Sequence, residues 1–127
     1  SPLCATAALE TLRQLSDPTV IQRIEDTGRQ VMETARKAAH DQGIPCSVQG
    51  VGAMFQTVFT PDGRPTRNYR DLLRVDQVRS HAFRHELLKR GVHANAFPMA
   101  CWFVSAAVTD HDLAATCTAI EEAFKTL

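Results

Sequence analysis

The sequence lacks an excess of charge of either sign, because fourteen Lys and Arg residues balance fourteen Asp and Glu residues. Modules that bind nucleic acid or a membrane surface usually carry a basic excess, so this balance argues against both classes. No apolar run approaches the ~20 residues that are needed to cross a bilayer. The chain opens at Ser1 without an initiator Met or a basic segment. We therefore expect no signal peptide, and a natural start that lies upstream.

Cysteine is also scarce, and its four positions are far apart in the sequence: Cys4, Cys46, Cys101 and Cys117. These spacings fit neither a zinc site nor the disulfide framework of a small secreted domain. The four cysteines therefore predict buried free thiols in a cytoplasmic protein.

The most apolar stretch covers residues 101–108, contains the only Trp, and predicts a strand that is buried on both faces. Thr109 follows as a predicted helix cap, with Asp110 and Asp112 at the positive end of the helix. The apolar face of this last helix has helical spacing and consists of Leu113, Cys117, Ile120 and Phe124.

Two further helices are predicted in the first third of the chain. One covers residues 1–15, with Pro2 in its first turn, and ends at Ser16. The other covers residues 18–42 after a cap at Asp17 or Ser16, and ends at Gly43. Its apolar face contains Val20, Ile24, Val31, Ala35 and Ala38.

The middle of the chain predicts one strand over residues 47–60, a loop to about residue 69, a helix over residues 71–90 and a short strand over residues 92–94. Val75, Val78, Ala82, Phe83 and Leu87 form the apolar stripe of that helix. This order of elements predicts a single α+β domain with a small, mainly antiparallel sheet that is covered by helices.

Two polar clusters are candidate binding sites. His81 and His85 have the spacing of two metal ligands on a helix, but no further ligand cluster accompanies them, so we interpret them as surface residues. Four arginines, at positions 64, 67, 70 and 74, could contact phosphate. Acidic residues at positions 62, 71 and 76 alternate with them, so a solvated face is the favoured interpretation.

Candidate nucleophiles and glycine motifs are incomplete. Cys101 and Cys117 are expected to be packing residues, and Ser105 lacks the glycines of a nucleophile elbow. The segment at residues 50–52 lacks the third glycine of a dinucleotide fingerprint. The loop that contains His93, Asn95 and Phe97 is a better candidate for binding, because binding residues concentrate in such loops; simple hydrogen bonding within the loop is the alternative.

Four motifs together resemble the C-terminal domain of class III pyridoxal-phosphate (PLP) aminotransferases of fold type I, in the branch that contains glutamate-1-semialdehyde aminomutase. They are Ser1-Pro2-Leu3-Cys4-Ala5-Thr6-Ala7-Ala8-Leu9; Val51-Gly52-Ala53-Met54-Phe55 with Val58-Phe59-Thr60; Asn68-Tyr69 with residues 71–76; and Gly91-Val92 with Trp102-Phe103-Val104-Ser105-Ala106-Ala107, Thr109 and Asp112. Their order and spacing carry the resemblance.

The resemblance implies a domain over residues 1–127 that lacks an upstream PLP-binding large domain with the Schiff-base lysine, and a connecting helix over residues 1–15. It implies an enzyme that moves an amino group on a small amine or amino acid, works as a homodimer and is inactive as this segment alone. The implied substrate-pocket residues are His93, Asn95, Phe97, Met99 and Ala100, and the implied cofactor-proximal residues are Ser1 and Pro2. No catalytic or metal-binding residue is assigned to the segment.

Two departures from the family pattern favour a transaminase over an aminomutase. Ala100 stands where the aminomutases have Glu, and Val108 stands where the family has His. The loop over residues 93–99 also differs from the family, so it is the expected place for substrate preference. A free-standing α+β module that binds a ligand or regulates without catalysis remains the alternative.

Overall fold

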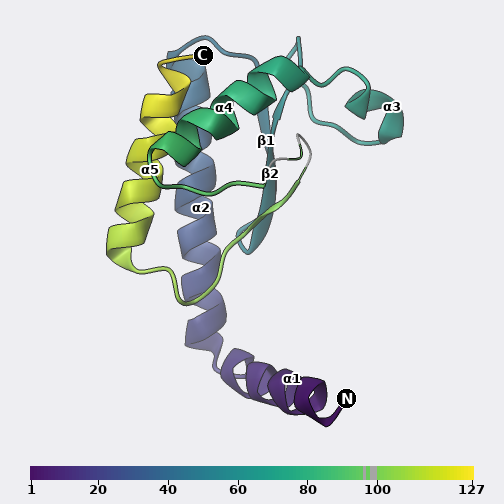
Figure 1. The fold of residues 1–127 in the computed structure, drawn as a ribbon, viewed down its shortest axis with the longest axis vertical. Helices are drawn as coiled ribbons and strands as arrows, with labels where there is room; N and C mark the ends of the chain where they lie inside the picture. Colours follow the sequence, from purple (N-terminus) through teal and green to yellow (C-terminus); the bar gives the residue numbers. More distant parts are fainter. Residues whose placement is uncertain (96, 98–99) are drawn as a thin grey trace.

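The computed structural model describes residues 1–95, 97 and 100–127. Over these residues the chain forms five helices and three strands (Figure 1). In chain order they are α1 (Pro2–Leu15), α2 (Pro18–Asp41), β1 (Cys46–Val51), β2 (Met54–Phe59), α3 (Tyr69–Leu72), α4 (Gln77–Lys89), β3 (Trp102–Phe103) and α5 (Asp110–Phe124).

The three strands form one antiparallel sheet in the order β1-β2-β3. The β1–β2 pair extends from Cys46 opposite Phe59 to Val51 opposite Met54, and β3 adds two residues to the other side of β2. Helix α2 packs against β1 and β2, and α5 packs against α2 and α4. The predicted α+β class with a small antiparallel sheet is confirmed.

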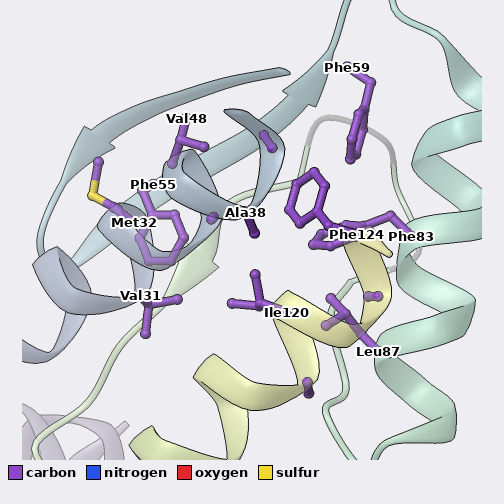
Figure 2. Packing of buried hydrophobic residues seen from close by; sticks show 14 residues of the cluster. Val31, Met32, Ala38, Val48, Phe55, Phe59, Phe83, Leu87, Ile120 and Phe124 are labelled. Carbon is purple, nitrogen blue, oxygen red and sulfur yellow. The ribbon is translucent and has the colours of Figure 1, made fainter. Parts of the chain in front are cut away.

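The hydrophobic core lies between the sheet and helices α2, α4 and α5 (Figure 2). At its centre the rings of Phe59, Phe83 and Phe124 lie with centroids 4.9 to 5.8 Å apart. These separations are typical of favourable aromatic pairs. Val31 and Ile120 extend the core along α2 and α5 (Figure 2).

The predicted boundaries of α2 and α5 are confirmed by their caps. The Asp17 carboxylate accepts a hydrogen bond from the Thr19 amide at 2.9 Å, with Pro18 in the first turn of α2. At α5 the Thr109 hydroxyl accepts from the Asp112 amide at 3.1 Å, and the Asp112 carboxylate accepts from the Thr109 amide at 3.0 Å. This reciprocal pair is a capping box, which satisfies amides that would otherwise lack partners.

The single strand predicted over residues 47–60 is wrong, because the chain reverses at residues 52–53 and forms the β1–β2 hairpin. Gly50 has φ +139°, a conformation that other residues rarely adopt. Gly52 lies so close to α2 that an added Cβ would be 2.5 Å from the Glu25 carbonyl oxygen. The two glycines therefore allow the turn and the close approach of α2.

The single helix predicted over residues 71–90 is also wrong, because α3 ends at Leu72 and α4 begins at Gln77. Asp76 caps α4 by accepting from the Arg79 amide, and its own amide donates to the Phe59 carbonyl at 2.9 Å. The second bond ties the break to the end of β2. Of the predicted stripe, Phe83 and Leu87 are buried, whereas Val78 is 82% exposed.

The predicted buried strand over residues 101–108 is reduced to the two residues of β3, and its Phe103 is 78% exposed. The reason is that β3 is an edge strand and pairs only with β2. The strand predicted over residues 92–94 is not formed. All four cysteines are free, but Cys4 is exposed and the other three are partly buried, so the prediction of buried thiols is wrong for Cys4.

Helix α1 extends away from the rest of the chain and contacts only the start of α2 (Figure 1). It buries none of its residues, and four large apolar side chains remain exposed: Leu3, Leu9, Leu12 and Leu15. This helix is therefore held by its own hydrogen bonds and not by packing.

Candidate functional site

A cavity of about 560 Å³ lies between α4, the segment that follows it and β3. Its lining residues are Arg84, His93, Ala94, Asn95, Ala100, Cys101, Trp102 and Phe103. We call it the Arg84 cavity.

The β3 side of the Arg84 cavity is held by the sheet. The Trp102 ring stacks on the Phe55 ring of β2 with centroids 5.5 Å apart and planes 13° apart. Next to it, the Gln56 amide donates to the Cys101 sulfur at 3.6 Å. These contacts attach one wall of the cavity to β2, through the buried Phe55 and the partly buried Gln56.

The structure places three of the five predicted substrate-pocket residues in the lining of this cavity: His93, Asn95 and Ala100. Phe97 is 68% exposed and does not line it, although its amide donates to the Asn95 side-chain oxygen at 3.0 Å. Met99 lies outside the described residues.

The two predicted cofactor-proximal residues, Ser1 and Pro2, lie at the start of α1. Both are exposed, and neither lines the Arg84 cavity. In Figure 1 the N-terminus is at the far end of α1, remote from the sheet. Within this chain the structure therefore does not bring them together with the substrate-pocket residues.

Sequence reasoning missed Arg84, which is only 9% exposed although it is charged. It shares the buried face of α4 with Ser80, Phe83 and Leu87. Burial lowers the pKa of its guanidinium below the ordinary value of an arginine. The one signal in the sequence was its place three residues before Leu87 and directly after Phe83, where an apolar residue is the usual choice.

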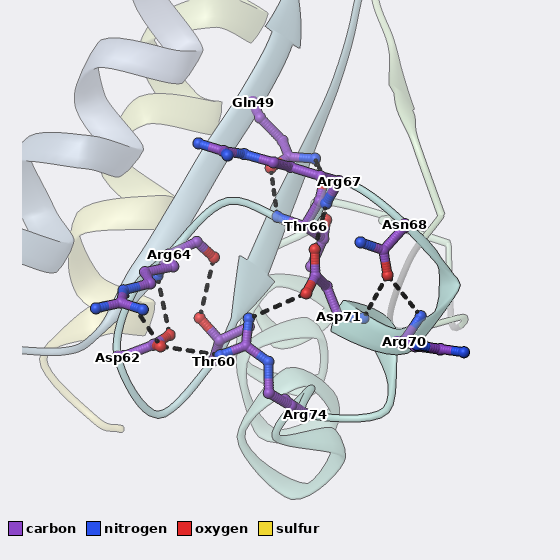
Figure 3. Close-up of polar contacts among 10 residues, drawn as sticks. All are labelled: Gln49, Thr60, Asp62, Arg64, Thr66, Arg67, Asn68, Arg70, Asp71 and Arg74. Carbon is purple, nitrogen blue, oxygen red and sulfur yellow. Dashed lines mark hydrogen bonds and ion pairs between the residues drawn. The ribbon is translucent and has the colours of Figure 1, made fainter.

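The arginine cluster of the loop over residues 60–76 forms ion pairs at the surface (Figure 3). Arg74 contacts Asp62 at 2.9 Å and Asp71 at 3.5 Å, and Arg64 contacts Asp62 at 3.6 Å. The Arg64 amide and the Arg74 guanidinium hold the pKa of Asp62 below its usual range. These pairs support the predicted solvated face.

Hydrogen bonds between Gln49 and Thr66 hold the loop that carries these arginines against β1 (Figure 3). The Gln49 amide donates to the Thr66 carbonyl at 2.9 Å, and the Thr66 amide donates to the Gln49 side-chain oxygen at 3.0 Å. The Asn68 side chain then caps α3 by accepting from the Arg70 amide at 2.9 Å. The cluster is therefore an ordered part of the structure that leads to α3.

His81 and His85 are both exposed on α4. Among the described residues, no three His, Cys, Asp or Glu side chains lie close enough together to hold a metal ion. Nor does any described helix combine the length and the apolar composition that crossing a membrane requires.

The three lysines are paired with acidic residues at the surface. Lys37 contacts Asp41 at 2.5 Å, Lys89 contacts Glu86 at 2.6 Å and Lys125 contacts Glu122 at 2.6 Å. Their hydrogen bonds to these carboxylates raise the pKa of Lys37 and of Lys125. An imine requires a neutral amine, so these two lysines are poor candidates for a Schiff base.

No family model matches the sequence. Several curated relatives match along all or nearly all of the chain. The chain is 35% identical over 127 residues to glutamate-1-semialdehyde 2,1-aminomutase of Verminephrobacter eiseniae (strain EF01-2), and 31% identical over 127 residues to the protein of that name from Desulfatibacillum aliphaticivorans. The chain spans 29% of the length of each of these two relatives.

Among solved structures, the chain is similar to the PLP internal aldimine form of the FumI protein of Sphingopyxis sp. MTA144. The similarity has a TM-score of 0.75 at 25% sequence identity, and covers 94% of this chain and 26% of that one. The sequence comparison and the structure comparison thus both match this chain to a segment of a longer protein.

Proposed function

Because the chain matches the C-terminal segment of a class III aminotransferase, we propose that it is the C-terminal domain of a PLP-dependent transaminase or aminomutase-like enzyme. The complete enzyme moves an amino group on a small amine or amino acid, and works as a cytoplasmic homodimer. The observation that carries the proposal is the match of all 127 residues to less than a third of each aminomutase relative.

In this proposal the cofactor and its lysine belong to a large domain outside residues 1–127. PLP chemistry needs a lysine imine and a cofactor cradle, and PLP supplies the electron sink for the reacting carbon. Lys37, Lys89 and Lys125 do not fit this role, because all three are exposed and paired with carboxylates. The segment alone is therefore inactive.

The role of this domain is to form one wall of the substrate pocket. Support comes from the Arg84 cavity, whose lining includes His93, Asn95 and Ala100. Phe97 lies next to Asn95 on the same loop, and Ser1 and Pro2 come close to the cofactor only when the large domain is present. Ala100 in place of the aminomutase Glu favours transamination.

The test uses the longer protein that contains this segment, beside the segment alone. The longer protein should bind PLP with imine absorbance, and should convert pyruvate to alanine with at least one amine donor from a panel. The segment alone should do neither. Specific turnover by the segment alone, or a longer protein that forms no imine, would contradict the proposal.

Substrate preference is tested in the same enzyme. Asn95→Ala and Phe97→Ala should change the relative activities among amine donors, because the loop over residues 93–99 is proposed to contact the donor. Val78→Ala, at an exposed residue of α4, is the matched control. Unchanged ratios in both loop variants would remove the loop from the substrate pocket.

One observation favours a second candidate, a ligand-binding module without catalysis: the residues of this chain alone line a cavity of about 560 Å³. An active longer protein with a PLP imine would decide against this candidate.

A further inference from the structure

Another cavity, of about 380 Å³, lies at the surface where the loop after β2 leads into α3. Its lining residues are Arg64, Pro65, Arg67, Asp71 and Arg74, and we call it the Arg67 cavity. Three of these five residues carry a guanidinium, and one carries a carboxylate. The lining therefore has an excess of positive charge, although the chain as a whole has none.

The ion pairs of this loop account for two of the three arginines. Asp62 contacts Arg64 and Arg74, and Asp71 also contacts Arg74. The Arg67 amide donates to the Asp71 carboxylate at 2.9 Å, but no described acidic side chain pairs with the Arg67 guanidinium. In Figure 3 no dashed line reaches this guanidinium. Its N–H groups are therefore available to a ligand.

The backbone that carries the free guanidinium is held on both sides. Before Arg67, the Thr66 amide donates to the Gln49 side-chain oxygen at 3.0 Å. At Arg67 itself, the amide is bonded to Asp71. Because these bonds already order the loop, a ligand that binds Arg67 loses less free energy to ordering the protein.

Arg64 also has donors to spare. It contacts Asp62 through Nε at 3.6 Å, which is longer than an ordinary hydrogen bond. A guanidinium carries five N–H donors, so this loose pair leaves most of those of Arg64 unused. Arg64 and Arg67 can therefore donate to one ligand in the cavity that both of them line.

The chemistry of the lining favours a phosphate group as the ligand. A phosphate monoester has three strong acceptor oxygens and carries close to two negative charges at neutral pH. It can therefore accept from two guanidiniums at once, whereas the two oxygens of a carboxylate match a single guanidinium. The carboxylate of Asp71 does not prevent this, because Asp71 is already paired with Arg74.

We propose that the Arg67 cavity binds the phosphate group of a small phosphate ester, with Arg67 and Arg64 as its charged partners. Arg74 remains paired with Asp62 and Asp71 and forms the side of the cavity. The proposal goes beyond the proposed function and does not rest on it, because all the residues of the site belong to this chain.

The side-chain Nε–H signals of Arg64 and Arg67 in NMR spectra give a direct readout. Methyl phosphate should shift both signals saturably. Dimethyl phosphate, which has a similar shape and one charge fewer, should bind at least about fivefold more weakly. Arg67→Gln should weaken methyl phosphate binding roughly fivefold or more, followed at the Arg64 signal. Arg67→Lys should weaken it less, because the charge remains.

The matched control is Arg70→Gln, which removes the same charge from the same loop at a residue that does not line the cavity. It should bind methyl phosphate as the original chain does. Arg64→Gln, followed at the Arg67 signal, should weaken binding and gives a second variant if Arg67→Gln does not fold. Circular dichroism checks the fold of each variant.

Three results would overturn the proposal. Equal weakening by Arg67→Gln and Arg70→Gln would show a diffuse attraction without a site. Acetate that binds as tightly as methyl phosphate would show that phosphate is not preferred. A phosphoserine peptide that binds more than about tenfold tighter than methyl phosphate would show that the ligand is a protein segment.

The longer protein allows a measurement that needs no turnover, so its result is independent of the proposed function. Phenylglyoxal modifies exposed arginines, and mass spectrometry identifies the modified peptides. Methyl phosphate should slow the modification of Arg67 but not that of Arg70, whether or not PLP has been added. Protection of Arg67 by PLP alone, or equal protection of both arginines by methyl phosphate, would overturn the proposed site.

Discussion

At the residue scale, two glycines determine how closely α2 approaches the β1–β2 hairpin. A Cβ added at Gly28 would lie 1.6 Å from the Gly52 carbonyl oxygen, far inside any possible contact. Because the atom in the way belongs to the backbone, a rotamer change cannot relieve the clash. The helix and the hairpin therefore meet backbone to backbone at this point.

Gly28→Ala should lower the free energy of unfolding by about 2 kcal/mol or more, because the hairpin must move away from α2. Helix propensity alone predicts the opposite sign, since Ala is favoured over Gly within a helix. Urea unfolding checks this. Gly43→Ala is the control, because its Cβ would meet no atom within 4 Å. The expected loss of stability there is about 1 kcal/mol, which comes from the backbone φ of +63° alone. A Gly28→Ala protein as stable as the original would contradict the close contact.

A second prediction at this scale concerns Cys46, whose thiol pKa is raised to about 12 by burial. At about pH 8 only about one molecule in ten thousand then carries the thiolate, so Cys46 should resist iodoacetamide. Cys4 is exposed and should be alkylated under the same conditions. Mass spectrometry of the alkylated peptides distinguishes them, and rapid labelling of Cys46 in the folded chain would contradict the prediction.

The same shift makes stability depend on pH. The folded pKa of about 12 lies above the ordinary value of 9.0, so the folded state holds the proton more tightly. The contribution of this proton to the free energy of unfolding is complete below about pH 9, and it is lost as the pH rises toward about 12. The Cys46→Ala variant should lose less of its free energy of unfolding than the original chain between about pH 9 and about pH 12. Unfolding measurements on both proteins over this pH range check this prediction.

At the scale of elements, α5 depends on its first turn. Thr109 and Asp112 satisfy one another's amides there, and Asp110 and Asp112 add negative charge at the positive end of the helix. The hydroxyl and amide of Thr109 lower the pKa of Asp112. The box therefore persists at neutral pH and is lost when acid protonates Asp112.

Thr109→Ala should lower the free energy of unfolding by about 1 kcal/mol, because the Asp112 amide loses its acceptor. Thr118→Ala is the matched control on the same helix, since Thr118 is exposed and only bonds back to the Ala114 carbonyl. Thermal unfolding should show no loss of stability for the control. Equal effects of the two changes would mean that the cap does not stabilise α5.

At the scale of the whole molecule, the isolated chain has an apolar helix that nothing covers. Leu3 is 79% exposed and Leu12 is 64% exposed, and exposed large apolar side chains of this kind promote association. In the proposed complete enzyme, other parts of the protein cover this helix. In the isolated chain, a second copy is the available cover.

The isolated chain should therefore self-associate as its concentration rises, and a variant with Leu3, Leu9 and Leu12 replaced by Gln should remain monomeric. Light scattering measures both. The variant should unfold at the same urea concentration as a low-concentration sample of the original chain, because α1 contributes nothing to the core. A monomeric original chain at high concentration would contradict this prediction.

The sequence predicted those parts of the fold that local chemistry specifies. The caps at Asp17 and Thr109 were found because a capping side chain acts within three residues of its own position. The reversal at residues 52–53 was missed because alternating apolar residues continue through it. The break before Gln77 was missed because Leu72, Leu73 and Val75 maintain an apolar pattern up to the cap of α4.

For the candidate site, the loop residues His93, Asn95 and Ala100 were predicted, whereas Arg84 was not. An arginine is usually exposed, so its side chain is expected in water. The cavity that it lines also needs β3, which pairs with β2 far away in the sequence, and this is a long-range event. No local pattern in the sequence reports such a contact.

The close backbone contact between Gly28 and Gly52 also affects how the molecule unfolds. Side chains can slip past one another, but two peptide backbones in direct contact fix the height and the rotation of a helix above its hairpin. We therefore expect the amide hydrogens of α2 and of the β1–β2 hairpin to exchange with solvent at the same free energy of opening. The Trp102 wall of the cavity, which rests on this hairpin, then persists for as long as that unit stays closed.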